Sequence, residues 1–110
     1  MEFKEYQKKA RTTALYPRKH KIIYPALGLG DEAGEVMGKI KKWLRDDDGN
    51  GKMNKERKNA IKEEMGDVLW YLASLAHDLG LNLDDIAKVN LEKLKSRKLR
   101  GKLKGDGDKR

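Results

Sequence analysis

The stretch IKEEMGDVLWYLASLAHDL, residues 61–79, has the strongest helical pattern in the chain. Its apolar positions recur at alternating steps of four and three residues, at Ile61, Met65, Val68, Leu72, Leu75 and Leu79. This spacing places them on one face of an α-helix. We expect the helix to stop near Gly80, because glycine suits the position that follows a helix C-terminus.

A second apolar stripe lies upstream. It has the same alternating spacing and comprises Leu29, Ala33, Val36, Ile40 and Trp43. Residues 46–52, DDDGNGK, show no such period and predict a turn between the two helices. Asn54 can cap the second of them, because its side-chain oxygen can accept a hydrogen bond from a first-turn backbone N–H.

Further helices are predicted on both sides of this pair. The N-terminal one should cover Phe3 to about Leu15, and Asn82 can cap a fourth helix. The residues before Pro17 and Pro25 should avoid helical geometry, because proline clashes with a helical neighbour. No segment shows convincing strand alternation. The fold class is therefore all-α, a helical bundle of four main helices.

Composition limits what such a chain can build alone. The 110 residues fit one domain, which we place at residues 1–100, followed by a basic, glycine-rich tail at 101–110. Only 37% of residues are hydrophobic and 40% are charged, a thin supply for a core. We therefore expect a homodimer or homotetramer. With no Cys, disulfides and thiolate zinc sites are excluded.

Charge and hydropathy suggest a location and a class of partner. The longest apolar run, residues 68–76, is too short to span a membrane, and no signal peptide is recognisable, so we expect a cytoplasmic protein. The formal charge is +8, and residues 88–110 contain ten Lys or Arg against three Asp or Glu. This excess is either a solvated basic tail or a surface that attracts phosphates.

Two acidic pairs suggest a site. Glu32 and Glu35, like Glu64 and Asp67, are three residues apart and share a helix face that borders the apolar stripe. If the two helices pack antiparallel, the four carboxylates converge, and at about 5 Å each pair would repel by roughly 3 kcal/mol. A cation would relieve this repulsion, and hard oxygen ligands favour Mg²⁺, Mn²⁺ or Ca²⁺.

Chance spacing of helical acids is the competing explanation, since Glu and Asp are common on helix surfaces. Gly34 and Gly38 favour a site, because each weakens a helix by about 1 kcal/mol relative to Ala unless a close approach compensates. Lys39 follows Glu35 by four residues, and we expect an intrahelical ion pair between them rather than a phosphate ligand.

These residues resemble the MazG-type family of all-α nucleoside triphosphate pyrophosphohydrolases. The family motif is E-x-x-E followed by E-x-x-D, and it reads here as Glu32-Ala-Gly-Glu35, 28 residues, then Glu64-Met-Gly-Asp67. The segment NLEKL with a following Arg, residues 90–97, resembles a downstream family segment, and the resemblance covers about residues 16–110. Asp31 departs from the family, where many relatives carry Gly.

The resemblance implies hydrolysis of a nucleoside triphosphate to the monophosphate and pyrophosphate. The four acids would bind Mg²⁺, with Mn²⁺ as an alternative, and a metal-activated water would attack. In this reading Lys93 and Arg97 hold phosphate oxygens and Asn90 positions the nucleotide. We assign Glu35 as the base that orients the water and Tyr71 as the residue that stacks on the substrate.

Two other functions remain open. The basic tail would suit a non-catalytic helical module that binds nucleic acid or a partner protein. Acids beside the core would give such a module no advantage. Nucleic acid is therefore the less favoured partner. Within the same superfamily, a phosphoribosyl-ATP pyrophosphohydrolase would share the acidic helices.

Overall fold

The computed structural model describes residues 1–47 and 51–110, and this part of the chain consists of helices joined by turns, with no strand. It contains α1 (Phe3–Ala10), α2 (Ile23–Asp47), α3 (Lys55–Asp78) and α4 (Leu83–Leu99), with short 3₁₀ helices at Arg11–Thr13 and Arg18–His20. The all-α prediction with four main helices is confirmed. No helix in this part of the chain is long and apolar enough to cross a membrane.

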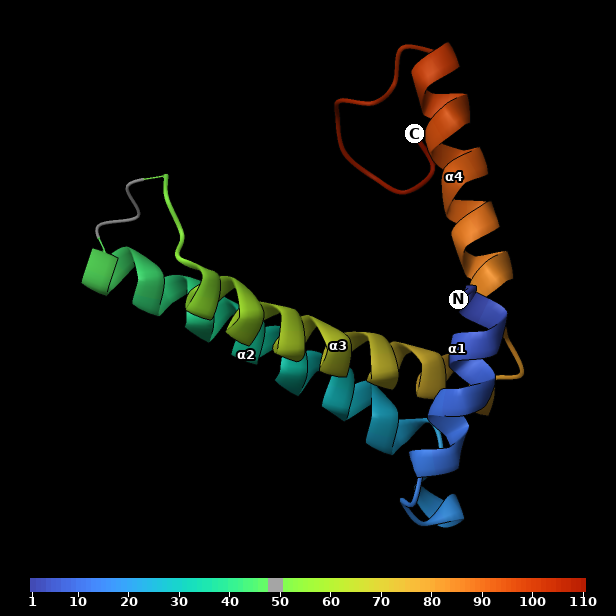
Figure 1. The fold of residues 1–110 in the computed structure, drawn as a ribbon. Helices are drawn as coiled ribbons and strands as arrows, with labels where there is room; N and C mark the ends of the chain where they lie inside the picture. Colours follow the sequence, from blue (N-terminus) through green and yellow to red (C-terminus); the bar gives the residue numbers. More distant parts are fainter. Residues whose placement is uncertain (48–50) are drawn as a thin grey trace.

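Helices α2 and α3 form a long antiparallel hairpin (Figure 1). As predicted, the Asn54 side chain caps α3 by accepting a hydrogen bond from the Arg57 backbone N–H at 2.8 Å. Gly80 follows the end of α3 with a φ of +73°, a conformation that favours glycine. Of the turn predicted at 46–52, Asp46 and Asp47 instead belong to α2, and residues 48–50 lie outside the described residues.

Two predicted boundaries were wrong. The N-terminal helix ends at Ala10 and continues as a 3₁₀ turn rather than reaching Leu15. Pro25 does not exclude helix, because α2 already begins at Ile23. Proline is tolerated there since the backbone N–H groups of a first turn have no intrahelical acceptor.

Helix α1 crosses the end of the hairpin and joins α3 to α4 through one buried side chain. The Gln7 amide donates hydrogen bonds to the carbonyls of Ala73 (3.3 Å) and Leu81 (3.1 Å). Its oxygen accepts one from the Leu83 backbone N–H at 3.0 Å. The small core lies beside it and consists of Ala73, Ala76 and Leu83, with Tyr6, Leu69, Leu72 and Ile86 packed against it.

A second polar anchor ties the segment before α2 to the end of α3. The fully buried Asp78 carboxylate accepts hydrogen bonds from the Tyr16 hydroxyl (2.7 Å), the Arg18 guanidinium (2.6 Å) and the Ile22 backbone N–H (3.0 Å). Burial raises the pKa of Asp78, but these hydrogen bonds outweigh it and hold the pKa at about 2.

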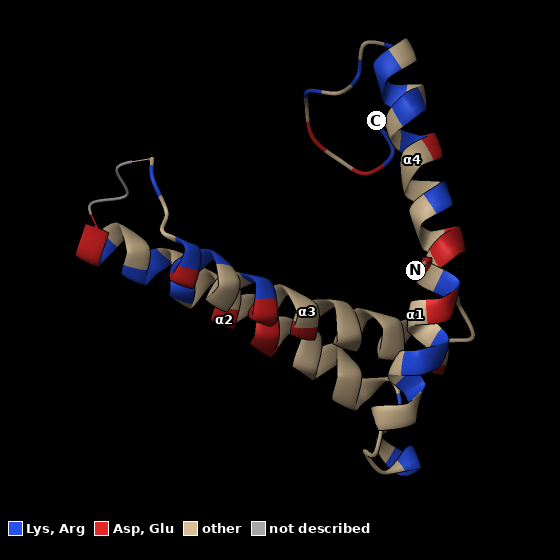
Figure 2. Cartoon of the chain, viewed as in Figure 1, with Lys and Arg blue, Asp and Glu red and all other residues tan. Residues whose placement is uncertain are grey.

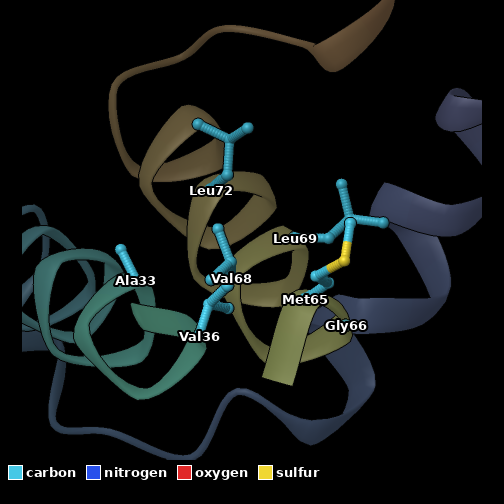
Figure 3. A pocket seen from close by; sticks show the side chains of 7 residues that line it. All are labelled: Ala33, Val36, Met65, Gly66, Val68, Leu69 and Leu72. Carbon is cyan, nitrogen blue, oxygen red and sulfur yellow. The ribbon is translucent and has the colours of Figure 1, made fainter. Parts of the chain in front are cut away.

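The chain is more open than a compact domain of its length. Helix α4 extends away from the hairpin (Figure 1), and the radius of gyration is 17.0 Å against about 13 Å expected for 110 residues. Much of the predicted core stripe stays accessible, with Met65 57% exposed. It borders an apolar groove of about 570 Å³ between α2 and α3 (Figure 3), lined by Ala33, Val36, Met65, Gly66, Val68, Leu69 and Leu72.

Candidate metal centre

The hairpin brings three of the four predicted acids together. Glu32 of α2 and Glu64 and Asp67 of α3 each offer a carboxylate oxygen, and these oxygens lie within 4.8 Å of one another. Acidic positions on the two helices lie side by side midway along the hairpin (Figure 2). The convergence follows from antiparallel packing of two helices that carry their acids next to the apolar stripe.

The pKa of Glu32 reflects its position among these acids. Burial raises the pKa of Glu32, and the neighbouring carboxylates of Asp67 and Glu64 raise it further. On α1, burial raises the pKa of the Tyr6 phenol, and the negative charge of Asp67 raises it further. Negative charges this close together disfavour the ionised form of each carboxyl group. A bound cation relieves that repulsion, so cation binding is favourable in such an environment.

Glu35 does not belong to the three-carboxylate group. It lies one turn further along α2 from Glu32, its side chain is exposed, and its oxygens are not among those that converge. Of the four predicted metal ligands, three therefore cluster and the fourth, Glu35, lies outside the cluster.

Lys39 has a different partner from the one predicted. Its ammonium lies 3.7 Å from a carboxylate oxygen of Glu64 on α3, so the ion pair joins the two helices and does not form with Glu35. The sequence favoured Glu35 because the two residues share a helix face at i, i+4. The antiparallel partner helix offers a nearer carboxylate.

Tyr71 lines a pocket next to the acids, and its predicted contact with a substrate stays a prediction. The pocket holds about 320 Å³ and is lined by Tyr24, Leu27, Gly28, Asp31 and Tyr71. A side-chain hydrogen bond with Tyr24, together with burial, raises the pKa of Tyr71 to about 12, with smaller contributions from Glu32 and Asp31. The phenol of Tyr71 thus stays protonated at neutral pH and can donate a hydrogen bond.

Gly28 makes the close approach that the sequence assigned to other glycines. A Cβ at Gly28 would lie 2.1 Å from the Tyr71 ring, whereas one at Gly34 or Gly38 would meet nothing within 4 Å among the described residues. No helix in the described part of the chain approaches Gly34 or Gly38, and the close approach of a ligand there stays a prediction. The missing side chain at Gly28 lets the aromatic ring of α3 lie against the backbone of α2.

Sequence reasoning missed the other members of this pocket, Tyr24, Leu27, Gly28 and Asp31. The signal was present, because positions 24, 28 and 31 have the i, i+4, i+7 spacing of one helix face. The proline at position 25 obscured it by suggesting that the helix begins later.

The predicted phosphate ligands lie elsewhere in the chain. Asn90, Lys93 and Arg97 are on α4, which projects away from the hairpin and its acids (Figure 1). Asn90 is exposed, and the other two contact the carboxylate of Asp108 in the segment after α4. The structure thus does not bring them to the three-carboxylate group of the same chain.

The donor set of the three-carboxylate group fits a hard divalent cation. Its oxygens come from Glu32, Glu64 and Asp67, with no nitrogen or sulfur ligand among them. Mg²⁺ is bound in proteins through a few carboxylates together with waters and substrate phosphates. An open cluster of three acids beside an aromatic pocket matches that requirement.

Comparison with known proteins identifies the family. Residues 23–100 match the MazG nucleotide pyrophosphohydrolase domain. The chain is 42% identical to the Gene 37 protein of Mycobacterium phage L5 over 111 residues, 96% of each chain. It is 38% identical to the uncharacterized protein YvdC of Bacillus subtilis (strain 168) over 72 residues, 63% of this chain and 68% of that one. No solved structure matches. The chain therefore belongs to the MazG nucleotide pyrophosphohydrolase domain family.

Proposed function

We propose that this protein hydrolyses nucleoside triphosphates, NTP or dNTP, to the nucleoside monophosphate and pyrophosphate. The observation that carries the proposal is the convergence of Glu32, Glu64 and Asp67, the positions of the family's acidic motif, within 4.8 Å. Membership of the MazG family supports the reaction class. The aromatic pocket beside the acids supports a nucleotide as the substrate.

The three clustered acids would hold Mg²⁺, with Mn²⁺ as an alternative. When bound, such an ion neutralises charge on the polyphosphate and lowers the pKa of a coordinated water. Burial and the neighbouring carboxylates raise the pKa of Glu32, and a bound cation would lower that pKa again. Lys39, now paired with Glu64 at 3.7 Å, supplies a positive charge at the edge of the same group.

Glu35 is the proposed base. It lies outside the cluster and is exposed, so its carboxylate is not held by the other acids and can accept a proton from an attacking water. The neutral phenol of Tyr71 faces the pocket, where the ring can contact the base or sugar of the nucleotide.

The phosphate ligands would come from a neighbouring copy of the chain. Lys93 and Arg97 lie on α4, away from the acids of their own hairpin, so the proposed site needs a second α4 to supply them. The apolar groove of α2 and α3 gives a second copy a surface to cover. We therefore propose a homodimer or homotetramer in which each hairpin receives a helix from another subunit.

A pyrophosphate-release assay tests the reaction class. A panel of canonical and damaged NTPs and dNTPs, with phosphoribosyl-ATP included, is incubated with Mg²⁺ or with EDTA. The proposal predicts metal-dependent formation of monophosphate and pyrophosphate in equal amounts from one or more of the nucleotides. Release from phosphoribosyl-ATP alone would favour the related superfamily activity, and no release from any compound would favour the non-catalytic basic module.

A further inference from the structure

Residues 101–110 form a loop that folds back beside α4 (Figure 1). Gly101, Gly105 and Gly107 have φ values of +65°, +111° and +88°, which side-chain-bearing residues rarely adopt. The Arg110 guanidinium fastens the loop by donating hydrogen bonds to the carbonyls of Lys102, Leu103 and Gly107 at 3.1, 3.1 and 2.7 Å. The basic, glycine-rich tail at residues 101–110 thus has a defined conformation.

The loop brings an acid onto the basic face of α4. A carboxylate oxygen of Asp108 lies 3.5 Å from the Lys93 ammonium and 3.8 Å from the Arg97 guanidinium. The same guanidinium donates a hydrogen bond to the Asp108 backbone carbonyl at 2.5 Å. Only 7% of the Arg97 side chain remains exposed, so a ligand in solution has little access to this guanidinium while the loop is in place.

We propose that Asp108 competes with the substrate's phosphate groups for Lys93 and Arg97, so that residues 101–110 form a displaceable lid over this anion site. The inference rests on the proposed function, which assigns these two cations to the substrate. A carboxylate and a phosphate oxygen bind the same donors, and both cannot be accommodated there without like-charge repulsion.

The contact is weak enough to be displaced. The Asp108 side chain is 90% exposed, and exposed ion pairs contribute little to stability because water and salt screen them. A triphosphate brings several negative charges and more acceptor oxygens than one carboxylate. The lid would therefore open for polyphosphates and remain closed against singly charged anions.

The first test measures anion binding rather than turnover. Tripolyphosphate is titrated by calorimetry, without divalent metal, into the wild type, Asp108→Asn and the matched control Asp106→Asn. Asp106 lies in the same loop, and its side chain has no hydrogen bond or ion pair with any part of the chain the structure describes. We expect Asp108→Asn to bind about two- to fivefold more tightly, the range for an exposed ion pair such as the one between Lys93 and Asp108, and Asp106→Asn to match the wild type.

A second readout follows the loop itself. Trypsin should cut after Lys102 and Lys104 faster when tripolyphosphate is added to the wild type, and Asp108→Asn should already be cut faster without it. Lys93→Gln should weaken tripolyphosphate binding, which locates the anion on α4.

The outcomes separate the lid from the proposed reaction. Equal tripolyphosphate affinity in the wild type and both Asp variants, or unchanged trypsin cleavage on adding the anion, would overturn the lid even if the wild type hydrolyses NTPs. Tighter tripolyphosphate binding by Asp108→Asn and anion-induced trypsin cleavage would support the lid. A lower KM for NTP in Asp108→Asn, with unchanged kcat, would show that the lid also acts during turnover. A wild type that releases no pyrophosphate would contradict the reaction without affecting the binding result.

Discussion

At the scale of single residues, side chains from distant parts of the sequence determine how the helices meet. Gln7 joins three segments through three hydrogen bonds, and Asp78 gathers three donors from residues 16–22. Gly28 permits the contact with the Tyr71 ring. None of these roles has a local sequence pattern, since each depends on a partner more than 40 positions away. Sequence periodicity indicates which residues share one face of a helix. It carries no information on contacts between residues of different helices.

The contact at Gly28 predicts a large effect from one methyl group. Gly28→Ala would place Cβ 2.1 Å from the Tyr71 ring, so the ring must move and the pocket must change shape. Overpacking of this kind costs about 1–3 kcal/mol, and we expect a lower free energy of unfolding in urea together with a higher KM. The control is Gly30→Ala, where no described residue would lie within 4 Å of the added methyl, which should stabilise α2. Equal unfolding midpoints for the two variants would contradict the contact.

Asp78 predicts loss of stability in acid. Its pKa is about 2 in the fold against 3.8 as the reference value, so the unfolded chain binds the proton more readily. The stabilisation is complete above about pH 4 and is lost as the pH falls towards 2, a loss of order 2 kcal/mol. Urea unfolding at several pH values should show this dependence in the wild type and in Asp106→Asn, and a weaker one in Asp78→Asn. An Asp78→Asn variant with the wild-type acid dependence would refute the assignment.

At the scale of helices, features that depend on residues close in sequence were predictable. Features that depend on the register between two helices were not. Asn54 and Asn82 cap α3 and α4 as predicted, because a cap depends only on the next three residues. The three-carboxylate group was also predictable, since two amphipathic helices joined by a short turn pack antiparallel. The ion pair of Lys39 was not, because the sequence does not give the register between α2 and α3.

Divalent cations should stabilise the α2–α3 hairpin. Binding to the native fold raises stability by mass action, and here it also removes repulsion among Glu32, Glu64 and Asp67. Thermal unfolding at constant ionic strength should show a Tm that rises by several degrees as Mg²⁺ goes from zero to millimolar. Asp67→Asn should reduce this rise, and Glu63→Gln, an exposed neighbour on α3, should keep it. A wild-type Tm that ignores Mg²⁺ would contradict a three-carboxylate cation site.

At the scale of the whole molecule, the single chain leaves its apolar stripe half open. The groove of α2 and α3 and the projecting α4 both suit an assembly. The shortage of hydrophobic residues predicted this incompleteness, but the direction of α4 could not be read from the sequence. The Gln7 hydrogen bonds hold the start of α4, because they reach Leu81 in the preceding turn and Leu83, the first residue of the helix.

Self-association should depend on the groove. Sedimentation of the wild type should give a mass that is a multiple of the 12.6 kDa chain. Met65→Glu puts a charge into the groove at a position 57% exposed in the monomer, so it should shift the protein to the single-chain mass while the helical circular dichroism is retained. Met37→Glu, at a position 67% exposed and outside the groove lining, should leave the assembly intact. A wild type that sediments at 12.6 kDa would rule out the shared site.

The most direct measurement compares pyrophosphate release from an NTP mixture with Mg²⁺ by the wild type, Glu64→Gln and Glu63→Gln. Both variants remove one negative charge from the same turn of α3, but only Glu64 belongs to the three-carboxylate group. We expect Glu63→Gln to release pyrophosphate like the wild type, and Glu64→Gln to lose metal-dependent release while its helical content is unchanged. Wild-type release by Glu64→Gln would contradict the assignment of the three-carboxylate group as the site of hydrolysis.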